Sequence, residues 1–177
     1  MVFNDADDRL KYSTGFIHEG EILMGYQNIS FGKNKPGINN GFDYRVVEID
    51  LPRPGVISAP RYDIELLCTT QKIKLQNALD TGEFADTIEL EVLSKDNNDS
   101  LYRKIAAINR RYFQDSRKLY AEGDSLGGAR VFAEWKAFQN KVMSMIDYKI
   151  DGKLEIQKAI DFGYSHTIHK SQGGTYN

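Results

Sequence analysis

Short apolar runs recur along the first half of the chain and are separated by polar or turn-forming residues. They lie at residues 22–24, 44–51, 62–66, 72–75 and 87–93, and in several of them polar and apolar positions alternate. Alternation with a period of two is typical of half-buried strands. The loop at 32–41 is rich in Gly and Asn, and Pro52 and Pro54 bound the second run. This spacing predicts a small β-barrel or sandwich, and we expect no helix in this half.

The pattern changes at the polar cluster 96–100, which can cap the start of a helix. An apolar stripe at helical spacing follows: Leu101, Ile105, Ile108 and Tyr112. Four cations fall largely outside this stripe: Arg103, Lys104, Arg110 and Arg111. After a break at 123–128 there is a second stripe: Phe132, Trp135, Phe138, Val142 and Met145. We predict a helical hairpin packed on itself or on the barrel, in preference to stacking of Trp135 or Phe138 on bases. A turn is expected at Asp151-Gly152.

Charge is distributed unevenly. Residues 1–99 hold 10 basic and 17 acidic side chains, whereas residues 100–177 hold 13 basic and 8 acidic ones. The C-terminal half is therefore the better candidate for a polyanion, although a solvated helical surface explains the same pattern. The single cysteine, Cys68, rules out an internal disulfide and is expected to be a small buried hydrophobe. With neither a signal-peptide pattern nor an apolar run of membrane-spanning length, we expect a soluble, cytoplasmic protein without a membrane partner.

The residues with the most informative chemistry lie near the end, at 164–176. Hydroxyl, imidazole and ammonium groups of Thr167, His169, Lys170 and Ser171 can donate to phosphate oxygens. Gln172 and two glycines follow, and the glycines allow close approach of backbone to an anion.

Three other readings of this segment are disfavoured. His166 and His169 are spaced as in some metal sites, but no Cys, Asp or Glu lies near enough in sequence to complete a ligand set, so no metal is expected. The lysine precedes the glycines, unlike a phosphate-binding Gly-x-x-x-x-Gly-Lys-Ser/Thr loop. Ser171 does not lie in a Gly-x-Ser-x-Gly elbow.

The run Thr167-Ile168-His169-Lys170-Ser171-Gln172-Gly173 resembles motif V of superfamily 1 DNA helicases, in particular the 5′-to-3′ Dda/RecD-like group. Gly20 to Met24, followed by Asn40-Gly41 and Tyr44 to Val47, is similar to the way these proteins lead into an SH3-like barrel. In them the barrel is inserted in the second RecA-like motor domain, ahead of motif V.

The resemblance implies a mixed α/β fold: a small SH3-like β-barrel plus a helical insertion, with flanking strands of an incomplete RecA-like domain. The first RecA-like strands would occupy 1–41, the barrel 42–95, the helical insertion 96–150, and the return strand with motif V 151–177. It also implies that Thr167 and His169 contact single-stranded DNA, supported by Lys170 and Ser171. Gln172 and Gly173 would face the ATP cleft.

The implied parent is an ATP-dependent helicase that uses ATP and Mg²⁺, with its first motor domain as a partner of this chain. The sequence contains no phosphate-binding loop, no Asp-Glu metal pair and no later arginine finger, and phosphoryl transfer needs all three together. We therefore expect a piece of a longer protein, with no catalytic residue here and no cofactor bound by the piece alone. Many members of that helicase group carry Glu two residues after the Gln-Gly pair, where it can contact the ribose of the nucleotide. This chain has Thr175 there, so the resemblance does not carry a direct nucleotide contact over to this segment. The alternative is a complete, non-catalytic module whose barrel and basic helices bind nucleic acid or protein.

Overall fold

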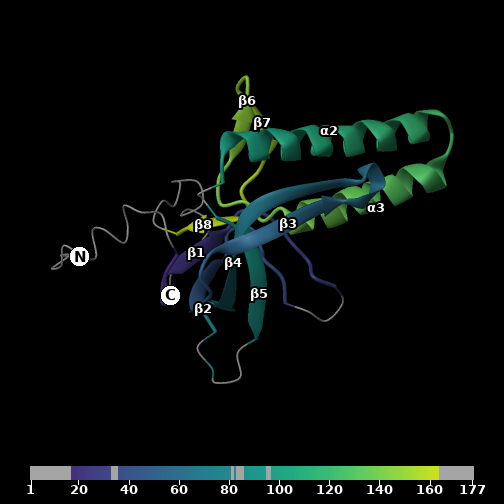
Figure 1. Ribbon diagram of the computed structural model, residues 1–177. Helices are drawn as coiled ribbons and strands as arrows, with labels where there is room; N and C mark the ends of the chain where they lie inside the picture. Colours follow the sequence, from purple (N-terminus) through teal and green to yellow (C-terminus); the bar gives the residue numbers. More distant parts are fainter. Residues whose placement is uncertain (1–16, 33–35, 81, 83–85, 95–96, 164–177) are drawn as a thin grey trace.

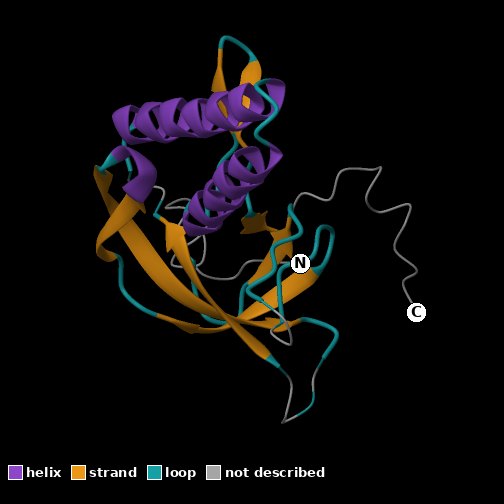
Figure 2. Cartoon of the chain, turned by 90° about the vertical axis from the view of Figure 1, so that its right-hand side faces the viewer, coloured by secondary structure: helices purple, strands orange, loops and turns teal. Residues whose placement is uncertain are grey.

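The computed structural model describes residues 17–32, 36–80, 82, 86–94 and 97–163. Within them, a curled antiparallel sheet is covered on one side by a pair of antiparallel helices (Figures 1 and 2). The sheet contains β1 (Ile22–Gly25), β2 (Asp43–Ile49), β3 (Arg53–Ala59), β4 (Ile64–Asn77), β5 (Thr87–Leu93) and β8 (Ile160–Phe162). The mixed α/β class and the small, barrel-like sheet are thus confirmed.

Strand β4 is the central strand of the sheet and pairs with β2, β3 and β5. Its first half pairs with β3, from Ala59↔Ile64 to Arg53↔Thr70, and its second half pairs with β2, from Ile49↔Ile73 to Tyr44↔Asn77. Strand β5 pairs with the second half of β4, from Gln76↔Thr87 to Thr70↔Leu93. The sequence pattern predicted two separate strands at 62–66 and 72–75. The structure joins them, because residues 67–71 continue the extended backbone without an interrupting Gly or Pro.

The β3–β4 hairpin turns through a short 3-10 helix, η1 (Pro60–Tyr62), and Asp63 adopts a left-handed conformation with φ 52°. This single turn is the only helical stretch in the described part of the first half, so the expectation of β structure there is confirmed.

Helix α2 (Asp99–Ala121) begins where the polar cluster predicted it. Asn98 is its N-cap, and the side-chain oxygen of Asn98 accepts a hydrogen bond from the Leu101 backbone N–H at 3.0 Å. All four residues of the predicted apolar stripe are buried. Arg103, Lys104, Arg110 and Arg111 are exposed, as the pattern indicated.

Helix α3 (Ser125–Lys141) differs from its predicted form. It begins inside the expected break, with Asp124 as N-cap, so Gly127 and Gly128 lie in its first turn. Its buried residues are Gly128, Val131 and Phe138, while Phe132 is exposed. Val142 and Met145 are buried, as predicted, but they lie beyond the helix end.

Two hydrophobic clusters result. One fills the inside of the curled sheet around Tyr44, Leu75 and Val92, and the other lies between the helix pair and the β3–β4 hairpin around Ile57, Ile105 and Phe138. Cys68 belongs to the second cluster, as expected of a small buried hydrophobe.

A two-stranded ribbon, β6 (Tyr148–Ile150) and β7 (Lys153–Ile156), follows the helices. Its turn lies at Asp151 and Gly152, which have φ angles of 50° and 77°. The predicted turn is confirmed. Two consecutive positive φ angles are the requirement that an Asp-Gly pair meets in a tight hairpin.

The chain then returns to the sheet. Strand β8 pairs antiparallel with β1, and β1 pairs antiparallel with β2. The described segments on both sides of the 41/42 boundary therefore belong to one continuous sheet. The four predicted domain limits remain predictions.

Candidate nucleic-acid interface

All six residues predicted to bind DNA or couple to the ATP cleft lie outside the described residues: Thr167, His169, Lys170, Ser171, Gln172 and Gly173. The described chain reaches Gly163, whose backbone N–H donates to the Ile22 carbonyl at 3.0 Å, one position after β8. The motif thus follows in sequence from a strand that is hydrogen-bonded into the sheet. Its geometry stays a prediction.

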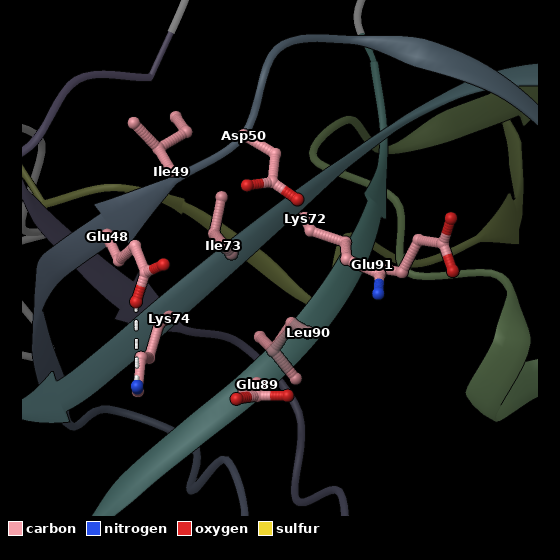
Figure 3. Close-up of a pocket in the computed structure, with 9 residues that line it drawn as sticks. All are labelled: Glu48, Ile49, Asp50, Lys72, Ile73, Lys74, Glu89, Leu90 and Glu91. Atoms are coloured by element: carbon pink, nitrogen blue, oxygen red, sulfur yellow. Dashed lines mark hydrogen bonds and ion pairs between the residues drawn. The ribbon is translucent and has the colours of Figure 1, made fainter.

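A cavity of about 360 Å³ lies over β2, β4 and β5 (Figure 3). Four carboxylates line it, from Glu48, Asp50, Glu89 and Glu91, against the two ammonium groups of Lys72 and Lys74. We call it the acidic groove. Two of the four carboxylates are ion-paired: the Lys74 Nζ atom lies 3.5 Å from Glu48 Oε2, and the Arg53 Nη2 atom lies 3.4 Å from Glu91 Oε1.

The surplus of carboxylates repels a nucleic-acid backbone and suits a cationic protein surface. Glu91 is held in place, because one of its oxygens accepts a hydrogen bond from the Thr70 hydroxyl at 2.7 Å. Glu89 makes no ion pair with a described cation and is exposed. Four acidic side chains of the first half of the sequence therefore line one recessed surface.

A second, larger groove of about 780 Å³ separates the β3–β4 hairpin from the helix pair. Its charges are mostly paired. Arg61 contacts Glu134 at 3.2 Å and Asp115 at 3.9 Å, and the Tyr62 hydroxyl donates to Asp115 at 2.9 Å. The Arg111 guanidinium lies 4.1 Å from the centre of the Tyr62 ring.

The contact between Tyr62 and Asp115 changes the pKa of the tyrosine hydroxyl. Burial raises the pKa of Tyr62, and the hydrogen bond to Asp115 raises it further. Asp115 and Glu134 already have partners in Arg61 and the Tyr62 hydroxyl. These contacts across the groove hold the hairpin against α2 and α3. Sequence inspection could not find it, since Arg61 and Asp115 belong to different elements and have no shared motif.

The two aromatic residues considered for base stacking differ in exposure. Phe138 is only 2% exposed and packs in the core between helices and hairpin, which excludes it as a stacking surface. Trp135 is partly exposed, and its indole N–H donates to the Asn109 side-chain oxygen at 3.0 Å.

Metal sites were also sought among the residues that the structure places. In that part of the chain no three His, Cys, Asp or Glu side chains come together as a possible ligand set. Burial raises the pKa of the Cys68 thiol, with a contribution from the Glu91 charge, which keeps the thiol protonated. His166 and His169 lie outside the described residues.

Neither helix in the described part of the chain is long and apolar enough to cross a membrane. No protein-family model matches the sequence, and no curated protein matches it.

Proposed function

We propose that this chain is part of an ATP-dependent DNA helicase that translocates along single-stranded DNA. The observation that carries the proposal is the run Thr167 to Gly173, which combines four phosphate-binding side chains with Gln172 and a glycine. Supporting it is the order of elements before this run: β1, the strands β2 to β5, the helix pair, the β6–β7 ribbon and then β8, which pairs with β1. In the proposal, β2 to β5 form an SH3-like barrel, and β1 and β8 belong to a RecA-like domain.

The proposed division of labour follows residue chemistry. Thr167 and His169 hold the single strand, with Lys170 and Ser171 as further donors to its phosphates. Gln172 and Gly173 transmit the state of the strand to the cleft in which the parent protein binds ATP and Mg²⁺. The first motor domain supplies the phosphate-binding loop, and the arginine finger comes from another part of the same protein.

The acidic groove has a separate role in this proposal. It docks a cationic surface of the first motor domain, because a recess lined by Glu48, Asp50, Glu89 and Glu91 disfavours direct contact with DNA. In this proposal, the strands β2 to β5 support the first motor domain during strand separation and make no direct contact with DNA.

The second candidate is a non-catalytic module that binds nucleic acid or protein. The observation in its favour is the basic surplus of the helix pair, which has nine Lys and Arg against five Asp and Glu across residues 99–141. The two candidates differ in what the complete gene encodes. A helicase gene carries a Gly-x-x-x-x-Gly-Lys-Ser/Thr loop upstream and an arginine-bearing motif downstream.

Steady-state ATP hydrolysis tests the proposal. The complete gene product should hydrolyse ATP and respond to single-stranded DNA, whereas the 177-residue chain alone should not, because it has no phosphate-binding loop. DNA-stimulated turnover by the 177-residue chain that survives repurification would contradict the assignment of roles. A complete gene product without DNA-stimulated turnover would favour the module.

A further inference from the structure

Aromatic rings gather on the outer face of the helix pair. Phe113 of α2 is 44% exposed and Phe132 of α3 is 43% exposed, and both flank Trp135 with ring centres 5.6 Å away. The hydrogen bond from the indole N–H to Asn109 fixes the Trp135 ring. Large apolar rings that are half exposed and adjacent commonly mark a binding surface.

Two cations border these rings. The Arg117 guanidinium lies 5.5 Å from the centre of the Phe113 ring, and the Lys136 ammonium lies 5.5 Å from Trp135 and 5.7 Å from Phe132. Neither cation forms an ion pair with a carboxylate of the described residues. We call Phe113, Arg117, Phe132, Trp135 and Lys136 together the aromatic face.

Carboxylates of the central helix turns lie elsewhere. Asp115 and Glu134 line the groove toward β3, where Arg61 pairs with both. Each is two residues from a phenylalanine of the aromatic face, and two residues correspond to about 200° around a helix. Asp115 and Glu134 are thus turned toward the groove and paired there with Arg61 and Arg130, which leaves Arg117 and Lys136 as the charges that border the rings.

We propose that the aromatic face binds single-stranded nucleic acid. Unpaired bases present flat surfaces to Phe113 and Phe132, while the phosphates between them lie within reach of Arg117 and Lys136. An acidic peptide would use the cations but leave the rings in water, and a duplex keeps its base surfaces stacked internally. This site is distinct from the run 167–173, and it stands whether or not the helicase assignment does.

Trp135 provides a local reporter, because it is the only tryptophan in the chain. Titration of the 177-residue chain with oligo-deoxythymidine should change the Trp135 fluorescence, and a duplex of equal length should have a much smaller effect. Phosphate contacts of Arg117 and Lys136 together should contribute about −1.4 to the log–log salt slope of binding. Fluorescence anisotropy of a labelled oligonucleotide gives the affinity independently.

Variants locate the site. Phe113→Leu and Phe132→Leu keep an apolar side chain but remove the stacking ring, so each should weaken binding about 5- to 100-fold. Lys136→Ala should flatten the salt slope by about 0.7. Phe42→Leu is the matched control, since Phe42 is 48% exposed and lies between β1 and β2. Lys104→Ala, an exposed cation nine residues before Phe113 on α2, controls for charge. Both controls should bind as the parent chain does.

Three results would overturn the inference. In the first, the labelled DNA binds without a change in Trp135 fluorescence, and Lys170→Ala abolishes that binding. The DNA would then lie on the run 167–173, and the helicase proposal would stay intact. The control variants could lose as much affinity as the phenylalanine variants. Finally, the chain could associate with itself in a manner that Phe132→Leu abolishes, with no response to DNA, which would show that a protein surface covers the aromatic face.

Discussion

The Asn97 side chain joins the end of the sheet to the start of helix α2. Its side-chain oxygen accepts a hydrogen bond from the Thr69 N–H at 2.8 Å, and its amide group donates to the carbonyls of Thr69 and Ser94 at 2.7 and 2.8 Å. It thereby continues the pairing of β4 just past the end of β5. The next residue, Asn98, caps α2. The polar cluster predicted the cap, but the contact with Thr69 depends on a strand far away in the sequence.

Removing this amide should cost stability. Asn97→Ala loses three partly buried hydrogen bonds and leaves backbone groups of Thr69 with fewer partners, so the free energy of unfolding should fall by about 2–3 kcal/mol. Urea denaturation measures it. The control, Asn140→Ala, changes an exposed residue of α3 and should stay within about 0.5 kcal/mol. A similarly small effect at Asn97 would contradict this account.

The pair between Arg110 and Glu155 predicts a pH dependence. The Arg110 Nε–H donates to Glu155 Oε2 at 2.8 Å, and the Arg110 Nη2 atom forms an ion-pair contact with Oε1 at 2.7 Å. The hydrogen bond from Arg110 holds the pKa of Glu155 below its ordinary value of 4.5, although burial acts in the other direction. A carboxylate with a lowered pKa stabilises the fold above the unfolded pKa. That stabilisation disappears as the pH falls through the folded pKa.

Arg110→Gln should therefore lower the melting temperature at neutral pH, and the difference from the unaltered chain should shrink below about pH 4.5. Arg103→Gln is the comparison, since its pair with Asp99 is exposed on both sides and contributes little. Melting curves across pH 3 to 7 give both differences. A difference for Arg110→Gln that does not change with pH would show that its effect comes from packing.

Among the elements, α2 and the β6–β7 turn could be predicted because local signals agree with the final packing. The stripe from Leu101 to Tyr112 faces the single cluster between helices and hairpin, and Asp151-Gly152 meets the backbone demand of a tight turn. Neither feature needs information from a distant residue.

Helix α3 could not be predicted as well, because its buried residues do not follow the apolar stripe of its own sequence. Packing against both α2 and β3 buries Gly128, Val131 and Phe138, which shifts the buried side away from Phe132. Gly128 lies so close to Tyr120 that an added Cβ atom would be 2.8 Å from its ring, so this glycine serves packing and does not break the helix. Past Lys141, the chain continues apolar because Met143 pairs with β5, where the Leu93 N–H donates to its carbonyl at 2.8 Å.

The acidic groove gives a prediction for β2, β4 and β5 that rests on the proposed function. In the complete helicase, the double variant Asp50→Asn, Glu89→Gln removes two of the four carboxylates. Exposed charge pairs contribute about 0.2–1 kcal/mol each, so docking of the partner surface should weaken about two- to thirtyfold. Unwinding should fall more than DNA-stimulated ATP hydrolysis.

Glu65→Gln, on the exposed hairpin half of β4, is the matched control and should leave both rates unchanged. Equal loss of unwinding and hydrolysis in the double variant would mean that the groove supports folding and does not dock a partner. Thermal melting of each variant separates these two cases.

For the molecule as a whole, the uneven charge of the sequence corresponds to two different surfaces, the acidic groove and the aromatic face. Four carboxylates of the first half line the recess over β2, β4 and β5, and two cations of the helix pair, Arg117 and Lys136, border exposed rings. Composition alone indicated that the two halves have different partners. It could not separate a solvated helix surface from an aromatic face, because Phe113 and Phe132 meet Trp135 only after α2 and α3 pair.

The final prediction concerns the motif and divides it into two functions. In the proposed helicase, the single ammonium group of Lys170 makes at most one phosphate contact, so Lys170→Ala in the complete protein should flatten the log–log salt slope of single-strand binding by about 0.7. The loss of affinity should be similar for all sequences, because a phosphate contact has no base information.

Gln172→Ala should act differently, since Gln172 is proposed to lie between the strand and the ATP cleft. Binding of the single strand should stay nearly intact while DNA-stimulated ATP turnover falls, because an interaction made only in the activated state changes the rate and not the ground-state affinity. If the run were simply a buried strand, both substitutions would lower melting temperature, affinity and turnover together. Measuring these three quantities on both variants decides between the readings. The proposed division is wrong if Gln172→Ala weakens DNA binding as much as Lys170→Ala does.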